Sequence, residues 1–346
     1  MNSTIRIGLK SAASAALSFS GAARLAHAAR FARLPLVIAY HRVVETLSAD
    51  GTALPAMEIT ASMLARHLDW IATRFDIVSL DELESMLNVR RRRPLAAITF
   101  DDGYSDVFHH GFPLLRRKGI PATMFVVTDL VGTDELPLHE RLYSSLAAAW
   151  RRWSTPDAEL ARLCGSSLRH AVNDPFAAAR QILQQLSHSD VEAIVASLGD
   201  AVPPRSEELR PMTWPMLAAM RDAGMTIGSH SRTHAFLTNE TAERVIDEVR
   251  GSRDAIRHHL GTAARTFAYP GGLFDSATVR AVKNAGYAFA FTTCTHRDAA
   301  EPLLTIPRTT LWERGAIGSS GRFSASIMSA HAAGAFEWRS SCATPH

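Results

Sequence analysis

Residues 95–103 read LAAITFDDG, and this stretch decides the fold class. Its first six residues form a short apolar run, which is typical of a strand that is buried on both faces of a sheet. Asp101 and Asp102 follow the run directly, and Gly103 permits a sharp turn. In parallel α/β folds, polar residues at the carboxyl ends of strands form the functional face. The stretch therefore predicts a buried parallel strand that ends at a functional site.

The same pattern recurs on both sides of this stretch. Short apolar runs predict further strands at residues 36–40, 122–127, 225–229, 266–269, 287–292 and 304–307. Apolar residues at helical spacing predict helices at residues 60–75, 81–87, 112–118, 214–223, 242–260 and 276–285. Strands that alternate with helices form a parallel sheet. About seven such units that close on themselves predict an α/β fold of the (β/α) barrel type.

Two segments depart from this alternation. Residues 133–210 are rich in Ala, Leu, Arg and Gln, and they have helical periodicity without a strand-like run. We interpret them as a helical insertion within a barrel at residues 35–315, rather than as an independent domain. Residues 316–346 are expected to form a C-terminal tail that is peripheral or frayed.

The N-terminal residues 1–34 contain five basic residues and no acidic one. We predict a basic helix there, which either contacts an anionic membrane surface or packs on the barrel. An export signal is the alternative, because Ala26-His27-Ala28 resembles a cleavage site. The expected location is therefore the cytoplasm or the inner membrane surface, with export as the other possibility.

The overall composition excludes several classes of protein. The 346 residues include 37 Lys+Arg and 34 Asp+Glu, a formal net charge of +3 that does not point to a nucleic-acid partner. The apolar content excludes disorder throughout the chain. Three cysteines without CxxC spacing do not make a disulfide framework and fit a reducing location.

A second polar cluster, SHSRTH, follows the strand predicted at residues 225–229. His230 and His234 are four residues apart, so a helical turn would place both on one face, where they can bind one metal ion. Two histidines and one carboxylate are the protein ligands of many catalytic zinc sites, and the second carboxylate is then free to act as a base. Each motif has an alternative interpretation. The two aspartates could cap a helix, and the two histidines could be unrelated surface residues.

Two further strand ends carry candidate residues. The turn after residues 266–269 contains Tyr269, Pro270 and Gly271, and its backbone N–H groups either donate to an oxyanion or only form a turn. His41 follows the first predicted strand and is either a general acid or base or a structural histidine.

These motifs, in this order, resemble the polysaccharide deacetylases, the NodB-type domain of carbohydrate esterase family four. The matching stretches are TFDDG at 99–103, SHSRTH at 229–234, FAYPGG at 267–272 and TIPR at 305–308. YHRV at 40–43 is similar to the branch that includes the poly-N-acetylglucosamine deacetylases. The resemblance implies a distorted (β/α) barrel and one divalent metal ion, with Zn²⁺ expected before Co²⁺, Ni²⁺ or Mn²⁺. It also implies hydrolysis of N-acetyl groups on a hexosamine-containing glycan or lipid-linked sugar.

The resemblance assigns roles to the residues of the motifs. Asp102, His230 and His234 would bind the metal, and Asp101 would be the general base that deprotonates the metal-bound water. Gly271 would donate its amide to the oxyanion, and a protonated His41 would donate to the leaving amine. Tyr104 and Tyr269 are expected to line the substrate site.

The sequence departs from the family pattern in two places. Many members have an arginine in the third motif that orients the base, but Ala268 stands there, so Arg308 is the candidate substitute. Many members also have a general-acid histidine in a late motif, and neither His296 nor His331 has the right neighbours for this role. His41 is therefore the expected acid.

Other functions remain open on the sequence alone. The same metal site would serve an O-acetyl esterase or an amidohydrolase of small amides, since loops determine the substrate. A non-catalytic glycan-binding relic is a further alternative. Asp101 argues against a relic, because metal binding alone would not require a second aspartate.

Overall fold

The computed structural model describes residues 35–49, 53–87, 89, 92–165, 172–199 and 210–335. Its centre is a ring of parallel strands in the order β1-β10-β9-β8-β7-β6-β5, which closes because β5 also pairs with β1. These strands are β1 (Leu36–Tyr40), β5 (Leu95–Phe100), β6 (Thr123–Val126), β7 (Thr226–Ser229), β8 (Thr266–Ala268), β9 (Phe289–Thr292) and β10 (Ile306–Thr310). The predicted barrel of seven parallel strands is confirmed.

The ring is uneven in its pairing, which makes the barrel distorted. The β1–β5 pair is the longest and runs from Leu36 opposite Ala96 to Tyr40 opposite Phe100. In contrast, β7 and β8 pair only at Ser229 and Phe267. The two-residue strand β4 (Asp76–Ile77) pairs with the beginning of β5, and β6 pairs with its end.

Alternate strand residues face opposite sides of the barrel wall, because side chains along a strand alternate with a period of two. One set packs in an inner cluster that includes Val37, Ala97 and Ile306. The other set, which includes Ile38 and Ile98, joins the larger cluster shared with the surrounding helices. Every residue of β5 is buried on one of these two sides, which explains its uninterrupted apolar run.

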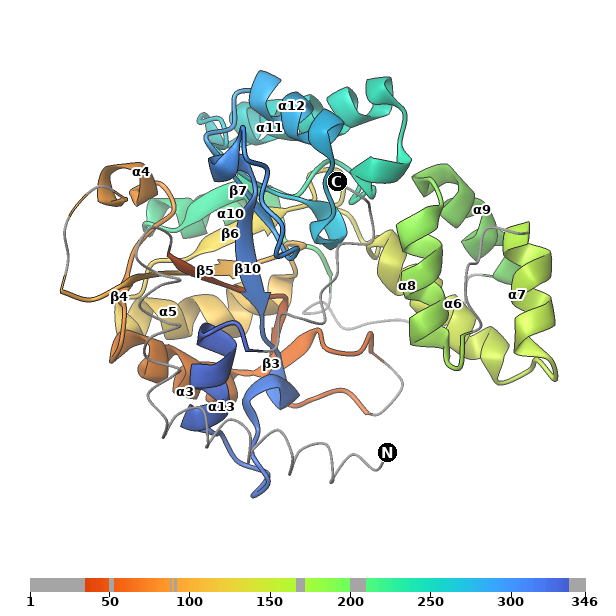
Figure 1. The fold of residues 1–346 in the computed structure, drawn as a ribbon, viewed down its shortest axis with the longest axis horizontal. Coiled ribbons are helices and arrows are strands. Elements are labelled where there is room, and N and C mark those ends of the chain that lie inside the picture. Colours follow the sequence, from red (N-terminus) through yellow and green to blue (C-terminus); the bar gives the residue numbers. More distant parts are fainter. Residues whose placement is uncertain are drawn as a thin grey trace.

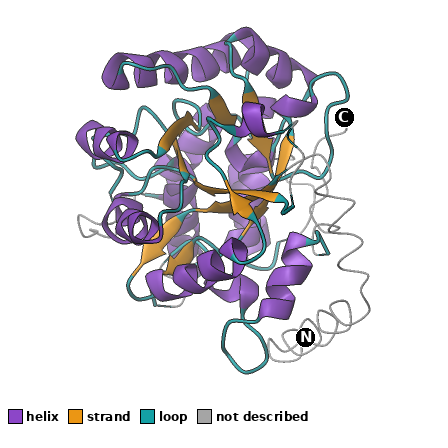
Figure 2. Cartoon of the chain, turned by 90° about the vertical axis from the view of Figure 1, so that its left-hand side faces the viewer, coloured by secondary structure: helices purple, strands orange, loops and turns teal. Residues whose placement is uncertain are grey.

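Helices surround the strands, as Figure 2 shows with purple helices around the orange strands. They are α3 (Ala61–Ala72), α4 (Leu83–Met86), α5 (Phe112–Lys118), α10 (Trp214–Asp222), α11 (Ala242–Leu260), α12 (Ser276–Asn284) and α13 (Ala325–Ala332). Threonine side chains cap α3, α10 and α11 by accepting a hydrogen bond from a backbone N–H of the first turn. The apolar faces of α3, α5, α10, α11 and α12 join the larger cluster on the outer side of the strands, as the helical spacing predicted, whereas Leu83 of α4 belongs to the inner cluster.

Four more helices lie between β6 and β7 in the chain. They are α6 (Leu138–Trp150), α7 (Pro156–Cys164), α8 (Pro175–Gln185) and α9 (His188–Leu198). Figure 1 shows them in green, gathered at one side of the barrel. They have a hydrophobic cluster of their own, centred on Leu142, Leu146 and Ile182, which is separate from the barrel cluster.

Short elements complete the described fold. They are β2 (Arg42–Val44), β3 (Glu58–Thr60), the π-helix η1 (Val107–Gly111), and the 3₁₀ turns η4 (Leu237–Asn239), η5 (Pro270–Gly272), η6 (Pro302–Leu304) and η7 (Glu313–Ala316). β2, β3 and β4 were not predicted, because strands of two or three residues have no recognisable apolar run. No helix among the described residues combines the length and apolar character needed to cross a membrane.

The C-terminal region is ordered in part. In the part of the tail after Arg322 that the structure describes, α13 buries Ile327 and Met328 and joins the barrel cluster through Met328, so this part is not frayed. Cys164 is a buried free thiol and Cys294 is disulfide-bonded, which is a single disulfide and not a framework. The expected basic segment at residues 1–34 lies outside the described residues.

Candidate active site

The alternation along the strands places the candidate residues at the mouth of the barrel. Ala97 and Thr99 of β5 face the inside of the barrel. Asp101 lies two residues after Thr99, just beyond the end of β5, and so faces the same side. Arg308 is likewise two residues beyond the inward-facing Ile306 on β10. Both side chains are almost fully buried. Strand phase and barrel closure therefore bring together two residues that are 207 positions apart.

Asp101 and Arg308 form a two-pronged ion pair. Arg308 donates from Nη1 to Oδ1 and from Nη2 to Oδ2, both at 2.7 Å, and also from Nη1 to the hydroxyl of Thr99 at 3.2 Å. Burial acts to raise the pKa of Asp101, but the charge and hydrogen bonds of Arg308 hold it below its usual value. Asp101 is therefore ionised at neutral pH and fixed in orientation. Arg308 thus makes the contact with Asp101 that a substitute for the missing arginine of the third motif would make.

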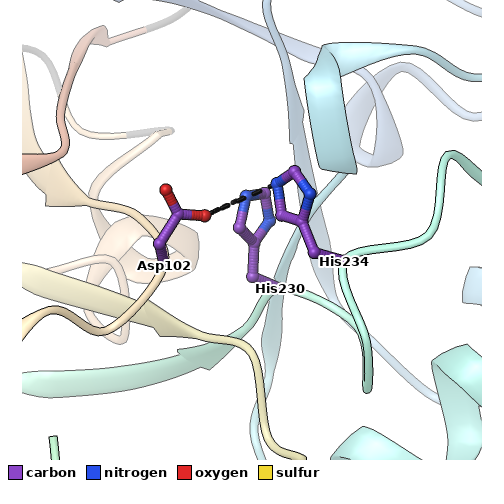
Figure 3. Close-up of side chains that lie close together, drawn as sticks. All are labelled: Asp102, His230 and His234. Carbon is purple, nitrogen blue, oxygen red and sulfur yellow. Dashed lines mark ion pairs between the residues drawn. The ribbon is translucent and has the colours of Figure 1, made fainter. Parts of the chain in front are cut away.

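Asp102, His230 and His234 form a buried cluster next to this pair (Figure 3). Each offers one ligand atom, and these atoms lie within 4.8 Å of one another. Asp102 Oδ1 is 3.6 Å from His230 Nε2 and 3.5 Å from His234 Nε2. Figure 3 shows both imidazole rings directed toward the carboxylate.

The donor set fits a divalent metal ion. Ligand atoms about 2.0–2.2 Å from one ion are separated from each other by distances of the order seen here. Neither oxygen of Asp102 has a hydrogen-bond partner among the described residues, although the carboxyl is buried. His230 donates from Nδ1 to the carbonyl of Ala268 at 2.7 Å, which leaves Nε2 free as a ligand. A bound cation would satisfy the carboxylate and both Nε2 atoms at once.

The protonation states agree with a ligand set. Burial, followed by the negative charge of Asp101, raises the pKa of Asp102 well above its usual value. Burial lowers the pKa of His230 to about 4 and that of His234 well below its usual value. The histidines are therefore neutral, as metal ligands must be, and a buried carboxylate without a cation is unfavourable.

The loop that carries the histidines is not the helical turn expected from their spacing. Residues 230–236 have no helical assignment, and both Ser231 and His234 have left-handed backbone conformations, with φ of 65° and 63°. Ser231 Oγ accepts a hydrogen bond from the backbone N–H of His234 at 3.0 Å. Asp102 also has a left-handed φ of 70°. Two of the three candidate ligands are thus held in strained conformations, which occur mainly at functional sites.

Glu248 of α11 binds this loop through hydrogen bonds. Its Oε2 accepts hydrogen bonds from the backbone N–H groups of Arg232 (2.8 Å) and Thr233 (2.9 Å), and its Oε1 accepts from the Thr233 hydroxyl at 2.6 Å. Glu248 is fully buried and pairs with Arg244. Glu248 could not be singled out from the sequence, because one acid in an amphipathic helix has no distinguishing pattern.

His41 lies close enough to Asp101, Arg308 and Glu140 for their charges to affect its titration. Burial lowers the pKa of His41, the Asp101 charge opposes this in part, and Arg308 adds to it. Its Nδ1 has no hydrogen-bond partner within the described part of the chain. The resting state of His41 is therefore neutral, and the general-acid role that the resemblance implies would require His41 to gain a proton during the reaction.

The three remaining candidates differ in position. Gly271 is exposed in η5, and its φ of 62° and the ring of Phe236, 2.3 Å from where a Cβ would lie, both require glycine. Tyr104 is buried beside the cluster, with its hydroxyl 3.4 Å from His139 Nε2. Tyr269 points elsewhere, since it is fully buried and its hydroxyl donates to the carbonyl of Leu304. The structure therefore does not bring the Tyr269 side chain to the site.

The insertion contributes a residue that the sequence analysis did not identify. His139, the second residue of α6, lies 3.8 Å from Asp102 Oδ2 through its Nε2. Its ring is 4.5 Å from the ring of His234, centroid to centroid. No motif marked this histidine, because it comes from a segment whose only signal was helical periodicity.

The comparisons with known proteins agree with this geometry. A family model described as polysaccharide deacetylase matches residues 88–156 and 173–290, which is more than half of the chain. The chain belongs to the polysaccharide deacetylase family. The resemblance drawn from the five motifs is confirmed.

A curated protein of this family resembles the chain over only part of its length. A protein of Bacillus subtilis (strain 168) named as a polysaccharide deacetylase, YxkH, is 27% identical over 104 residues, 29% of this chain and 34% of that protein. The match thus spans about a third of the relative's length. Its name describes that protein, and the whole relative's activity does not transfer from so short a match.

Solved structures share the fold over most of the chain. The Streptococcus pyogenes deacetylase PplD, in complex with acetate, has a TM-score of 0.54 at 16% identity and covers 83% of this chain and 95% of its own. IcaB from Ammonifex degensii has a TM-score of 0.53 at 17% identity and covers 86% and 96%. A de-N-acetylase from Aggregatibacter actinomycetemcomitans has a TM-score of 0.50 at 16% identity and covers 80% and 94%. These similarities show the NodB-type fold.

Proposed function

We propose that this deacetylase hydrolyses the N-acetyl group of a hexosamine residue in a glycan or lipid-linked sugar. The observation that carries the proposal is the buried Asp101–Arg308 pair beside the Asp102–His230–His234 cluster. Amide hydrolysis by an activated water requires an ionised, oriented carboxylate as the base, next to side chains that can bind a metal ion. A binding relic would have no need for the second aspartate or for the arginine that orients it.

The first step requires a base and a place for the water. A divalent ion bound by Asp102, His230 and His234 supplies Lewis-acid polarisation and lowers the pKa of water. Asp101 takes the proton of the attacking water as the new carbon–oxygen bond forms at the acetyl carbon. Because Arg308 occupies one lone-pair direction on each oxygen of Asp101, the other directions remain to accept that proton.

The second step breaks the carbon–nitrogen bond. An amine cannot leave as its anion, so a protonated group must donate to the nitrogen. We assign this role to His41, which is near Asp101 in the barrel mouth. Since the resting His41 is neutral, it has to receive a proton during the cycle, and the proton taken up by Asp101 is the nearest source. The backbone N–H of Gly271, which is an exposed residue, is assigned to the carbonyl oxygen as its negative charge develops.

Acetate release from N-acetylglucosamine oligomers tests the proposal. The wild type would be assayed with added Zn²⁺ or Co²⁺ and with chelator, beside Asp101→Asn and the exposed control Glu243→Gln. We expect metal-dependent release that Asp101→Asn abolishes and Glu243→Gln leaves intact.

Matched substrates separate the alternatives. O-acetylated sugars and small acetamides would be assayed with the same proteins. Release only from O-acetyl esters would assign an esterase, and stoichiometric metal without any acetate release would contradict the hydrolase proposal.

A further inference from the structure

The helical insertion reaches into the metal site through its first turn. His139 is one residue after the start of α6 and is almost fully buried. Its Nε2 is 3.8 Å from Asp102 Oδ2 and 3.4 Å from the Tyr104 hydroxyl. Its Nδ1 has no hydrogen-bond partner among the residues described by the structure. Of the two ring nitrogens of His139, Nε2 is therefore the one that faces Asp102 and Tyr104.

The two oxygens of Asp102 face different groups. Oδ1 is the oxygen near His230 and His234, at 3.6 and 3.5 Å. Oδ2 is the oxygen near His139. If Oδ1 is the ligand atom, Oδ2 needs a hydrogen-bond donor, because a buried carboxylate oxygen without a partner is costly. Carboxylates that bind metal ions are commonly held in this way by a donor on the second oxygen.

A buried charge network fastens His139 to the barrel. Arg42, which follows His41, donates from Nε to Asp106 Oδ2 at 2.9 Å, and its Nη1 is 3.7 Å from Glu140 Oε1. All three side chains are at most 2% exposed. The Arg42 guanidinium also lies 4.6 Å above the ring of Tyr104. Because Glu140 is adjacent to His139 on α6, this network sets the place of His139 relative to Asp102.

We propose that His139 is a positioning residue that donates an Nε2–H hydrogen bond to Asp102 Oδ2 and so orients Oδ1 toward the metal ion. The inference rests on the proposed metal site and makes the insertion part of it. Closing the present 3.8 Å gap to hydrogen-bond length requires an approach of about 1 Å.

Metal affinity tests the role directly and does not depend on substrate. Zn²⁺ dissociation constants would be measured by competition with a chromophoric chelator for the wild type, His139→Ala, His139→Gln and the exposed control His258→Ala. Loss of a hydrogen bond to a ligand typically weakens metal binding about 10- to 100-fold, and we expect this for His139→Ala. His139→Gln should restore most of the affinity, because the Gln amide reaches the position of Nε2 and donates an N–H.

The absorption spectrum of the Co²⁺-loaded protein separates positioning from ligation. We expect the visible bands of His139→Gln to match those of the wild type, since the ligand set is unchanged. Wild-type Zn²⁺ affinity in His139→Ala would overturn the proposal. Equal loss of affinity in both variants, with a changed spectrum for His139→Gln, would also overturn it and would make His139 a ligand.

Two further measurements distinguish a failure of the His139 proposal from the absence of a metal site and from misfolding of a variant. Asp102→Ala should bind no Zn²⁺ at the site, and unchanged binding in this variant would refute the metal site itself. Circular dichroism of each variant reports folding. If His139→Ala does not fold, the affinity and spectrum of His139→Gln still decide whether His139 is a ligand.

Discussion

Replacement of Arg308 by glutamine tests the assignment of Asp101 as a base held ionised by its partner. The variant removes a buried charge that makes two 2.7 Å hydrogen bonds to Asp101 and leaves the carboxyl in the barrel mouth. Burial then acts without its main opposing charge, because His230 and His41 are the smaller influences that lower the pKa of Asp101, and that pKa rises. An opposite charge at this range lowers a carboxyl pKa by about 1–3 pH units, and its removal reverses that shift.

The expected result is a displaced pH profile. A base with a raised pKa is protonated at higher pH, so the acidic limb of kcat/KM for acetate release should move upward by about 1–3 pH units. Arg308→Lys keeps the charge and loses the two-pronged geometry, so its acidic limb should move less while kcat falls. Unfolding by urea should show a loss of up to about 3–5 kcal/mol at neutral pH for Arg308→Gln, the cost of breaking a buried ion pair.

A double variant isolates the interaction. In an Asp101→Asn background, Arg308→Gln should cause much less additional loss of activity, because the two residues act as a unit. An acidic limb that stays in place in Arg308→Gln, in a folded and active protein, would refute the reasoning.

Three further predictions concern the loop, the core and the metal. Glu248→Ala should weaken Zn²⁺ binding measured by chelator competition, since it releases the backbone of Arg232 and Thr233; Glu248→Gln should lose less, and wild-type affinity in Glu248→Ala would contradict this. Burial lowers the pKa of His67 to about 3, so its stabilising contribution is full above about pH 6.5 and is lost as the pH falls. Between pH 6.5 and 5, the free energy of unfolding of the wild type should fall by about 2 kcal/mol because of His67, and His67→Gln should not show this part of the fall in urea unfolding. The same pH dependence in both proteins would be inconsistent with a neutral buried histidine. Chelation should lower Tm, and Zn²⁺ at about 100 times its Kd should return about 2.7 kcal/mol, whereas an unchanged Tm would argue against a bound ion.

The barrel strands were predictable because burial on both faces requires a continuous run of apolar residues. β1, β5 and their neighbours are buried on both faces, so they appear as short apolar runs, and the predicted bounds of β1 and β5 agree with the structure. β2 and β3 could not be predicted, since three-residue strands that pair only with each other carry no such run.

The candidate site was only partly readable from the sequence. Asp101, Asp102, His230 and His234 stand directly after predicted strands, and their residue types at those places indicate a metal-dependent hydrolase. The conformation of the histidine loop was misjudged, because spacing of four residues indicates a helical turn only when the backbone is helical. Here the left-handed φ of His234 brings the rings together instead.

The sequence by itself determined the fold class, the family and the four residues at the ends of β5 and β7, because each depends on neighbours in the chain. The tertiary structure decided which distant groups meet them. Closure of the ring places Arg308 on Asp101, and the buried Arg42–Glu140 contact places His139 beside Asp102. Such contacts depend on strand phase, barrel closure and burial in three dimensions, which no local pattern of residues records.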